Sequence, residues 1–283
     1  MEIIVGKNAG FCYGVKRAVD GTFQELKNGK KVYCLGELIH NKKVVERLQD
    51  KGSILIENLS EVKEKNARVI IRAHGVAKEV YEEAEKREIE LIDYSCPSVL
   101  KIHDIAKEYS QNGYFILLTC ASKIHPEVIG IESFCGKNYA LIENIEELEN
   151  AVNQFKMNKV LLISQTTFNM KKFDEMERRL KEIIDANTDL VIQNTICNTT
   201  QIRQEETEKL AKEVDKMIII GGKNSSNTKK LYEIALSQCK NTIFVETKED
   251  LKDEDFSTTN KVGIMAGAST PQELIEELVK ALS

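Results

Sequence analysis

The chain has 283 residues, of which 42 % are hydrophobic and 30 % are charged, and its formal net charge is -5. This length exceeds what one ordinary core serves, so we expect several small units or one large α/β unit. The negative charge argues against a nucleic-acid partner held by a general positive field, and no apolar run is long enough to cross a membrane. The N-terminus lacks a signal-peptide pattern, so we expect a cytoplasmic protein whose seven cysteines are thiols or metal ligands rather than disulfides.

Short β-branched runs predict buried strands along the whole chain. They lie at residues 2–5, 31–35, 53–56, 69–71, 114–118, 159–163, 217–220, 242–245 and 262–265. Stretches with helical spacing separate most of these runs, and the clearest examples are 80–87 and 173–184. This alternation predicts an α/β fold with mostly parallel sheets covered by helices.

Three cysteines suggest how the chain divides. Cys12, Cys96 and Cys197 each lie at a break between a strand-like and a helix-like run, and about one falls in each third of the chain. We therefore expect three small α/β units in a pseudo-three-fold arrangement around a central cavity. The expected units are 1–96, which includes the N-terminal strand and the Cys12 loop, 97–194, and 195–283, which includes the C-terminal helix.

Three thiolates brought together by such a fold could hold an iron–sulfur cluster by three of its irons and leave the fourth iron for a substrate. The other four cysteines lie in or next to apolar runs and are expected to be packing residues. These are Cys34, Cys120, Cys135 and Cys239.

The histidines are few and unevenly placed. His40, His74 and His125 each follow a strand-like run, where ligands bind in α/β folds, whereas His103 falls inside a helical stretch and is expected to be structural. A solvated loop side chain is the simpler explanation for any one of the three. Three equivalent positions among only four histidines favour a functional role.

Polar turns end three other strand-like runs. Gly221 and Gly222 lead to Ser225, Ser226 and Asn227 at a helix start, which is typical of an anion site and also of an ordinary helix cap. The segment 266–271 repeats this pattern: Ser269 can cap a helix with Gln272 completing a capping box, and capping alone would explain it. Thr166 and Thr167 form the third turn, for which a plain strand-to-helix turn is the alternative.

Glu127 lies two residues after His125. In a closed pocket burial raises the pKa of such a carboxyl group and makes it a candidate general acid. An exposed glutamate in the first turn of a helix is the ordinary structural alternative.

These motifs, in this order, resemble the 4-hydroxy-3-methylbut-2-enyl diphosphate reductase family over nearly the whole chain. The matching motifs are Gly10-Phe11-Cys12-Tyr13-Gly14-Val15, Leu38-Ile39-His40-Asn41, Ala73-His74-Gly75-Val76, Ser95-Cys96-Pro97, His125-Pro126-Glu127-Val128, Ser164-Gln165-Thr166-Thr167, Ile196-Cys197-Asn198-Thr199-Thr200, Lys223-Asn224-Ser225-Ser226-Asn227 and Ala266-Gly267-Ala268-Ser269. The resemblance implies a trefoil of three α/β units around a [4Fe-4S] cluster held by three cysteines, Cys12, Cys96 and Cys197.

The family also implies a reaction and its partners. The reaction is the reductive dehydroxylation of (E)-4-hydroxy-3-methylbut-2-enyl diphosphate to isopentenyl and dimethylallyl diphosphate, with the substrate hydroxyl at the open iron. Reduced ferredoxin or flavodoxin is the implied electron donor. Glu127 would deliver protons, and Thr166, with Thr167 beside it, would face the hydroxyl. The implied diphosphate-binding residues are His40, His74, His125, Ser225, Ser226, Asn227 and Ser269.

Two other functions use the same residues. A zinc-dependent hydrolase or structural zinc protein would employ the cysteines and histidines, but zinc sites usually contain close ligand pairs such as C-x-x-C, which this sequence lacks. A redox sensor would bind a cluster without catalysis and would not need the anion-binding turns.

Overall fold

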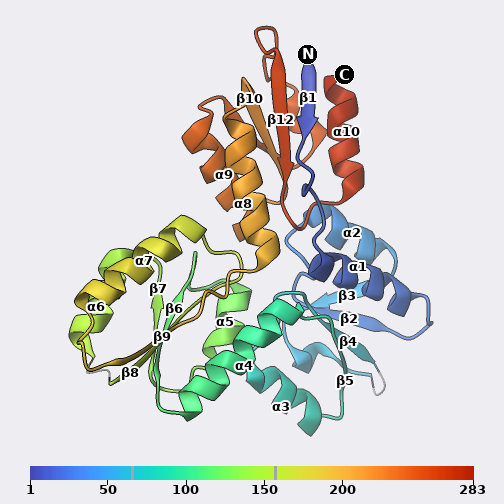
Figure 1. Ribbon diagram of the computed structural model, residues 1–283. Helices are drawn as coiled ribbons and strands as arrows, with labels where there is room; N and C mark the ends of the chain where they lie inside the picture. The colour runs from blue at the N-terminus through green and yellow to red at the C-terminus, as the bar shows by residue number, and fades with distance from the viewer. Residues whose placement is uncertain (65–66, 156–157) are drawn as a thin grey trace.

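Three four-stranded parallel sheets organise the computed structural model, which describes residues 1–64, 67–155 and 158–283 (Figure 1). The strand order is β3-β2-β4-β5 in the first sheet, β7-β6-β8-β9 in the second and β1-β12-β10-β11 in the third. The strands are β1 Glu2–Val5, β2 Val32–Leu35, β3 Ser53–Ile56, β4 Arg68–Ile71, β5 Glu90–Asp93, β6 Phe115–Thr119, β7 Tyr139–Ile142, β8 Lys159–Ser164, β9 Asp189–Ile192, β10 Lys216–Ile220, β11 Thr242–Val245 and β12 Lys261–Ala266. The parallel α/β architecture confirms the predicted fold class.

Helices cover both faces of every sheet, and each sheet therefore carries two apolar clusters. The second sheet packs against α6 and α7 on one face and against α4 and α5 on the other. The first sheet packs in the same way against α1 and α2 on one face and against α3 on the other, and the third against α8 and α9 and against α10. The helices are α1 Tyr13–Leu26, α2 Lys42–Asp50, α3 Lys78–Lys86, α4 Pro97–Gln111, α5 Pro126–Glu132, α6 Ile145–Gln154, α7 Met170–Ile183, α8 Asn198–Ala211, α9 Ser226–Gln238 and α10 Gln272–Leu282, and short 3₁₀ turns lie at Leu59–Glu61 and Lys248–Leu251.

Three strands were not predicted from the sequence, and all three lie at sheet edges. They are β5, β7 and β9, which have four residues each and are largely half-buried. An edge strand needs fewer apolar residues than a central one. The sequences of β5, β7 and β9 therefore lack the strong apolar runs that identify the central strands β2, β6 and β10.

The N-terminal strand differs from the expected division of the chain. β1 pairs in parallel with β12, so Glu2–Val5 belongs to the C-terminal sheet and not to the first unit (Figure 1). The three sheets then share one pattern, in which β1, β5 and β9 are the equivalent edge strands beside β12, β4 and β8. The third unit is thus completed by the first strand of the chain.

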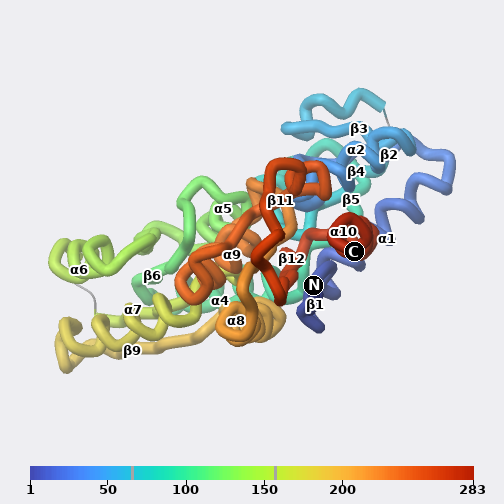
Figure 2. Tube along the Cα trace, turned by 90° about the horizontal axis from the view of Figure 1, so that it is seen from above, coloured from blue at the N-terminus to red at the C-terminus, as the bar shows by residue number. Residues whose placement is uncertain are grey.

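Each equivalent edge strand leads into a helix that packs on the next unit. β1 leads to α1 on the first sheet, β5 to α4 on the second, and β9 to α8 on the third. Cys12, Cys96 and Cys197 are the N-cap residues of these three helices. The cysteines therefore lie at the three junctions between units, and Figure 2 shows the first and second units on opposite sides of the third.

None of the helices in the described ranges has the length and apolar character needed to cross a membrane. The cytoplasmic location expected from the sequence stays a prediction.

Candidate active site

One pocket at the centre of the three units is lined by all thirteen residues that the sequence analysis selected. They are Cys12, His40, His74, Cys96, His125, Glu127, Thr166, Thr167, Cys197, Ser225, Ser226, Asn227 and Ser269. Most of them follow the carboxyl ends of parallel strands, which is where α/β folds place ligand sites. The four cysteines expected to be packing residues are buried.

The backbone of each pocket cysteine is anchored in the same way. The amides of Cys12, Cys96 and Cys197 donate to the carbonyls of Ala268 at 3.2 Å, Ala73 at 2.9 Å and Thr166 at 3.1 Å. Each acceptor lies two residues beyond the end of β12, β4 or β8. Three equivalent hydrogen bonds thus fix the three cysteine loops to three sheets.

The thiols at these positions are stabilised by helix N-termini. Cys12 Sγ accepts from Val15 N at 3.5 Å, and Cys197 Sγ accepts from Thr200 N at 3.4 Å. Burial raises the pKa of Cys96 and Cys197, and the charge of Cys12 raises both further, which indicates that the three sulfurs share one electrostatic environment. A positively charged partner would favour the thiolates that metal ligation requires.

Gly14 brings the first and second cysteine loops together. A Cβ atom added at this residue would lie 2.7 Å from Cys96 Sγ, which is too close for any side chain. The missing side chain therefore leaves room for the sulfur to face the pocket.

Replacing Gly14 with alanine should displace the Cys96 sulfur at a cost of roughly 1–3 kcal/mol of overpacking. We expect Gly14→Ala to bind less than half of the wild-type iron after anaerobic reconstitution, measured as iron and sulfide per chain. The control is Gly113→Ala, where an added Cβ meets open space although the backbone φ is 78°. Full iron content in Gly14→Ala would contradict this role for the glycine.

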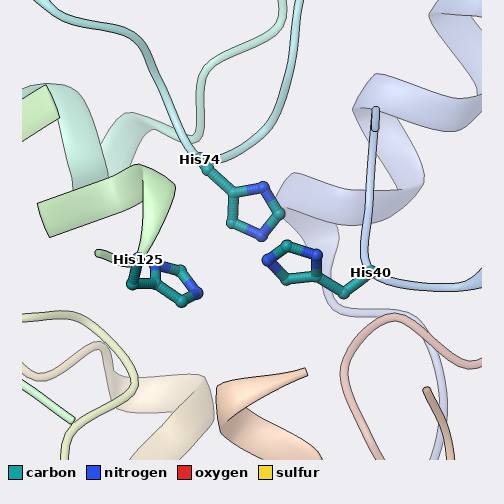
Figure 3. Close-up of side chains that lie close together, drawn as sticks. All are labelled: His40, His74 and His125. Atoms are coloured by element: carbon teal, nitrogen blue, oxygen red, sulfur yellow. The ribbon is translucent and has the colours of Figure 1, made fainter. Parts of the chain in front are cut away.

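Three histidine rings converge in the same pocket (Figure 3). The ring centroids of His40 and His74 are 4.3 Å apart, and that of His125 lies 5.3 Å and 5.5 Å from theirs. Burial lowers the pKa of all three imidazoles, to about 3 for His125 and well below the usual value for His74. Burial therefore favours the neutral form of each ring.

The hydrogen bonding of His125 favours an anion over a metal ion at this ring. The ring nitrogens lie within 4.8 Å of one another, a spacing that suits a metal. However, His125 Nδ1 accepts from Glu127 N at 3.1 Å, so the neutral ring carries its proton on Nε2 and offers a donor to the pocket. Among the described residues, His74 Nδ1 and Asn227 Nδ2 are buried without hydrogen-bond partners. Buried polar atoms of this kind call for a ligand rich in oxygen.

Glu127 and Thr166 form the most tightly bonded pair in the pocket. Glu127 is 2 % exposed, and its two carboxylate oxygens accept from Thr166 N at 2.7 Å and from Thr166 Oγ1 at 2.8 Å. Burial raises the pKa of Glu127 to about 7, although both hydrogen bonds oppose this shift. The carboxyl group is thus able to hold or release a proton near neutral pH, which the exposed-glutamate alternative would not allow.

The remaining polar turns hold the units together as well as lining the pocket. Ser225 caps α9 by accepting from Thr228 N at 3.2 Å, and Thr167 Oγ1 lies 3.2 Å from Ser226 Oγ. The predicted capping role of Ser269 is wrong, because α10 begins beyond it without a side-chain cap and Ser269 Oγ donates to the His40 carbonyl at 3.2 Å.

The two glycines before Ser225 pack against protein. An added Cβ at Gly222 would lie 2.3 Å from the His40 carbonyl oxygen, and one at Gly221 would lie 2.7 Å from Thr228 Oγ1. A side chain at either position would therefore collide with neighbouring protein atoms. The sequence analysis also missed Arg203, a buried cation in the pocket wall.

The fold and the pocket define a class of protein in which three parallel α/β units bring one cysteine each to a shared site. A model of the LytB protein family matches residues 3–283, and the chain belongs to this family. A relative from Caldanaerobacter subterraneus subsp. tengcongensis, a 4-hydroxy-3-methylbut-2-enyl diphosphate reductase, is 42 % identical over 286 residues, which cover 100 % of this chain and 96 % of the relative.

Two solved structures are also similar. One, of an (E)-4-hydroxy-3-methyl-but-2-enyl diphosphate reductase described as the terminal enzyme of the non-mevalonate pathway, has 40 % identity, a TM-score of 0.71 and coverage of 100 % of this chain and 99 % of the other. The other, of the E-1-hydroxy-2-methyl-but-2-enyl-4-diphosphate reductase from Plasmodium falciparum, has 28 % identity, a TM-score of 0.90 and coverage of 99 % and 87 %.

Proposed function

We propose that this chain reduces (E)-4-hydroxy-3-methylbut-2-enyl diphosphate to isopentenyl and dimethylallyl diphosphate, using an iron–sulfur cluster. The main observation in support of this function is a single pocket that combines three cysteine-capped helices, three neutral histidines and a buried glutamate–threonine pair. The full-length relationship to 4-hydroxy-3-methylbut-2-enyl diphosphate reductases gives independent support. The reaction takes up two electrons and two protons and releases the hydroxyl group as water.

The donor set fits a [4Fe-4S] cluster held by Cys12, Cys96 and Cys197. The three thiols come from three units, each at a helix N-terminus, and Gly14 leaves space beside Cys96 Sγ. The bound cluster would supply the electrons and the Lewis acidity of the iron that no cysteine holds. Reduced ferredoxin or flavodoxin is the proposed source of these electrons.

The histidine side of the pocket suits the diphosphate. His40, His74 and His125 offer neutral N–H donors, and Ser225, Ser226, Asn227 and Ser269 add hydroxyl and amide groups near the N-terminus of α9. Helix N-termini favour bound phosphate groups. Anchoring the substrate by this end would orient its alcohol toward Thr166 and the cysteines.

Glu127 and Thr166 are placed to move a proton. Glu127 Oε1 is occupied by the Thr166 amide, so a proton on this carboxyl group resides on Oε2, which faces Thr166 Oγ1. In that state the threonine hydroxyl accepts from Glu127 and directs its own hydrogen elsewhere in the pocket. Thr166 would then relay the proton to the leaving hydroxyl, while Thr167, bonded to Ser226, would lie nearer the diphosphate.

The alternatives are not favoured. A zinc hydrolase would need His125 Nε2 as a free electron-pair donor, whereas the hydrogen bond to Nδ1 places a proton there. A sensor without catalysis would not require the buried Glu127–Thr166 pair. The division of the chain at residues 96 and 194 also remains a proposal, with residues 2–5 moved to the third unit.

The decisive test is an anaerobic assay of the reconstituted protein with reduced methyl viologen and the hydroxylated diphosphate. We expect both isomeric products, together with iron and inorganic sulfide in equal amounts. A colourless protein with one zinc per chain would overturn the proposal in favour of the hydrolase. A cluster-bearing protein that forms neither product would overturn it in favour of the sensor.

His74→Asn should mainly weaken substrate binding. Losing one charge-assisted hydrogen bond costs about 1.5–3 kcal/mol, which corresponds to roughly a 10- to 150-fold increase in the substrate Kd. Calorimetric titration of the oxidised protein measures this directly, and the iron content serves as the control for an intact site. An unchanged Kd would remove His74 from the diphosphate-binding set.

A further inference from the structure

Arg203 is a buried cation that neither the sequence motifs nor the proposed reaction explains. It lies in α8, is 3 % exposed and lines the same pocket as the three cysteines. Burying a guanidinium group is costly unless its charge and its N–H groups are compensated. The groups around Arg203 should therefore include the hydrogen-bond acceptors and negative charges that compensate the guanidinium group.

The hydrogen bonds of Arg203 connect two cysteine loops. Nη2 donates to the Gly10 carbonyl at 2.6 Å, and Nη1 lies 3.3 Å from the Thr199 carbonyl. Gly10 is two residues before Cys12, and Thr199 is two residues after Cys197. Nε is buried and has no partner among the described residues. One guanidinium group thus ties together the loops that carry two of the three sulfurs.

Its hydrogen-bond acceptors are neutral carbonyls, so the positive charge must be balanced by other groups. Burial lowers the pKa of Arg203, whereas the charges of Cys12, Cys197 and Glu206 favour its charged form. Glu206 accepts from the amides of Lys7 at 2.6 Å and Asn8 at 3.0 Å, and its carboxylate offsets part of the charge of Arg203. The thiolates that a metal in the pocket requires would supply further negative charge beside the guanidinium group.

We propose that Arg203 is a positioning residue that supplies the counter-charge for the thiolate ligands and raises the reduction potential of the cluster. This inference rests on the proposed function. Reduction adds a negative charge at the centre of the pocket, and a buried cation nearby stabilises the reduced form, because Coulomb interactions are strong where water is excluded. Net charge, hydrogen bonding and exposure are known to set such potentials.

The chain offers a matched control in Arg17. Arg17 also donates to carbonyls beside a cysteine, Ser95 O at 3.0 Å and Asp93 O at 3.1 Å, but it is only half-buried and lies outside the pocket wall. Arg17→Met therefore loosens a ligand loop and removes a charge that water already screens. Arg203→Met removes a charge that water does not reach.

The experiment is a redox titration of each reconstituted variant, followed by the electron paramagnetic resonance signal of the reduced cluster, with iron and sulfide counted per chain. We expect a midpoint potential that is more negative in Arg203→Met than in the wild type, and near the wild-type value in Arg203→Lys and Arg17→Met. Loss of the cluster in Arg203→Met but not in Arg203→Lys would support the same conclusion, because lysine shares the positive charge of arginine but not its hydrogen-bonding geometry.

Three results for the Arg203 variants would overturn the inference. They are an unchanged potential in Arg203→Met, equal shifts in Arg203→Met and Arg203→Lys, and equal cluster loss in those two variants. An equally large negative shift in Arg17→Met would also overturn it, since loop loosening alone would then explain the effect. Absence of a cluster from the wild-type protein would instead refute the proposed function.

Discussion

Cys96→Ser is expected to lose the iron–sulfur cluster and, with it, all measurable reductase activity. Cys96 begins α4 at the junction of the first and second units, and its amide is fixed to the Ala73 carbonyl. A serine hydroxyl is a poor ligand for iron compared with a thiolate, and two remaining cysteines from two other units hold a cluster weakly. The measurement is visible absorbance with iron and sulfide content after anaerobic reconstitution.

The control for this variant is Cys135→Ser. The Cys135 thiol is fully buried, lies outside the pocket and donates to the Ile131 carbonyl at 3.4 Å, an interaction that a serine hydroxyl reproduces. This variant should retain its cluster and its activity. A fully loaded, active Cys96→Ser protein would refute the ligand role of Cys96.

Glu127→Gln should assemble the cluster and bind substrate but lose about 10²- to 10⁴-fold in kcat, the usual contribution of a general acid. Glutamine keeps the size of the side chain and an acceptor for the Thr166 amide, but it carries no transferable proton. Single-turnover kinetics of the pre-reduced protein isolate this step from electron delivery. Glu132→Gln, on the same helix but outside the pocket, should react at the wild-type rate. Normal turnover in Glu127→Gln would remove this residue from proton delivery.

The raised pKa of Glu127 fixes the direction in which activity and folding stability change with pH. Because the pKa of Glu127 is raised from 4.5 to about 7 in the protein without substrate, wild-type kcat/KM should fall as the pH rises above about 7, and the residual activity of Glu127→Gln should lack this limb. Stability follows the same linkage: the unfolded chain loses this proton near pH 4.5 while the folded chain keeps it until about pH 7. The cluster-free Glu127→Gln protein should therefore gain stability relative to the wild type across that interval, by up to about 3 kcal/mol in urea unfolding.

The residues of the pocket were accessible from the sequence because their chemistry is local. The histidine and hydroxyl residues follow predicted strand-like runs, and the carboxyl ends of parallel strands meet at one edge. Cys96 and Cys197 were selected from the motifs around them, although β5 and β9 before them were not predicted. Long-range pairing leaves no such local signal. Nothing in Glu2–Val5 indicates that its partner is Lys261–Ala266, so the first unit was given a strand that it does not contain.

Arg203 was missed for a related reason. It lies in a helix whose sequence is mostly polar and charged, NTTQIRQEETEKLA, and such a stretch is typical of a solvated surface. Only the tertiary packing of α8 between the third sheet and the Gly10 loop buries it. The helix cap predicted at Ser269 is wrong for the same reason, because the Ser269 hydroxyl group donates to the carbonyl of His40, which is distant in sequence.

The pairing of β1 with β12 has a consequence for biosynthesis. The segment Lys261–Ala266 must be synthesised before Glu2–Val5 can pair with it, and the Cys12 amide finds its acceptor at Ala268 only after that. A cluster held by all three cysteines would therefore be loaded only after this late segment has folded. A chain truncated before Lys261 would keep Ala73 and Thr166, which anchor the loops of Cys96 and Cys197. It would lack Ala268, which anchors the loop of Cys12.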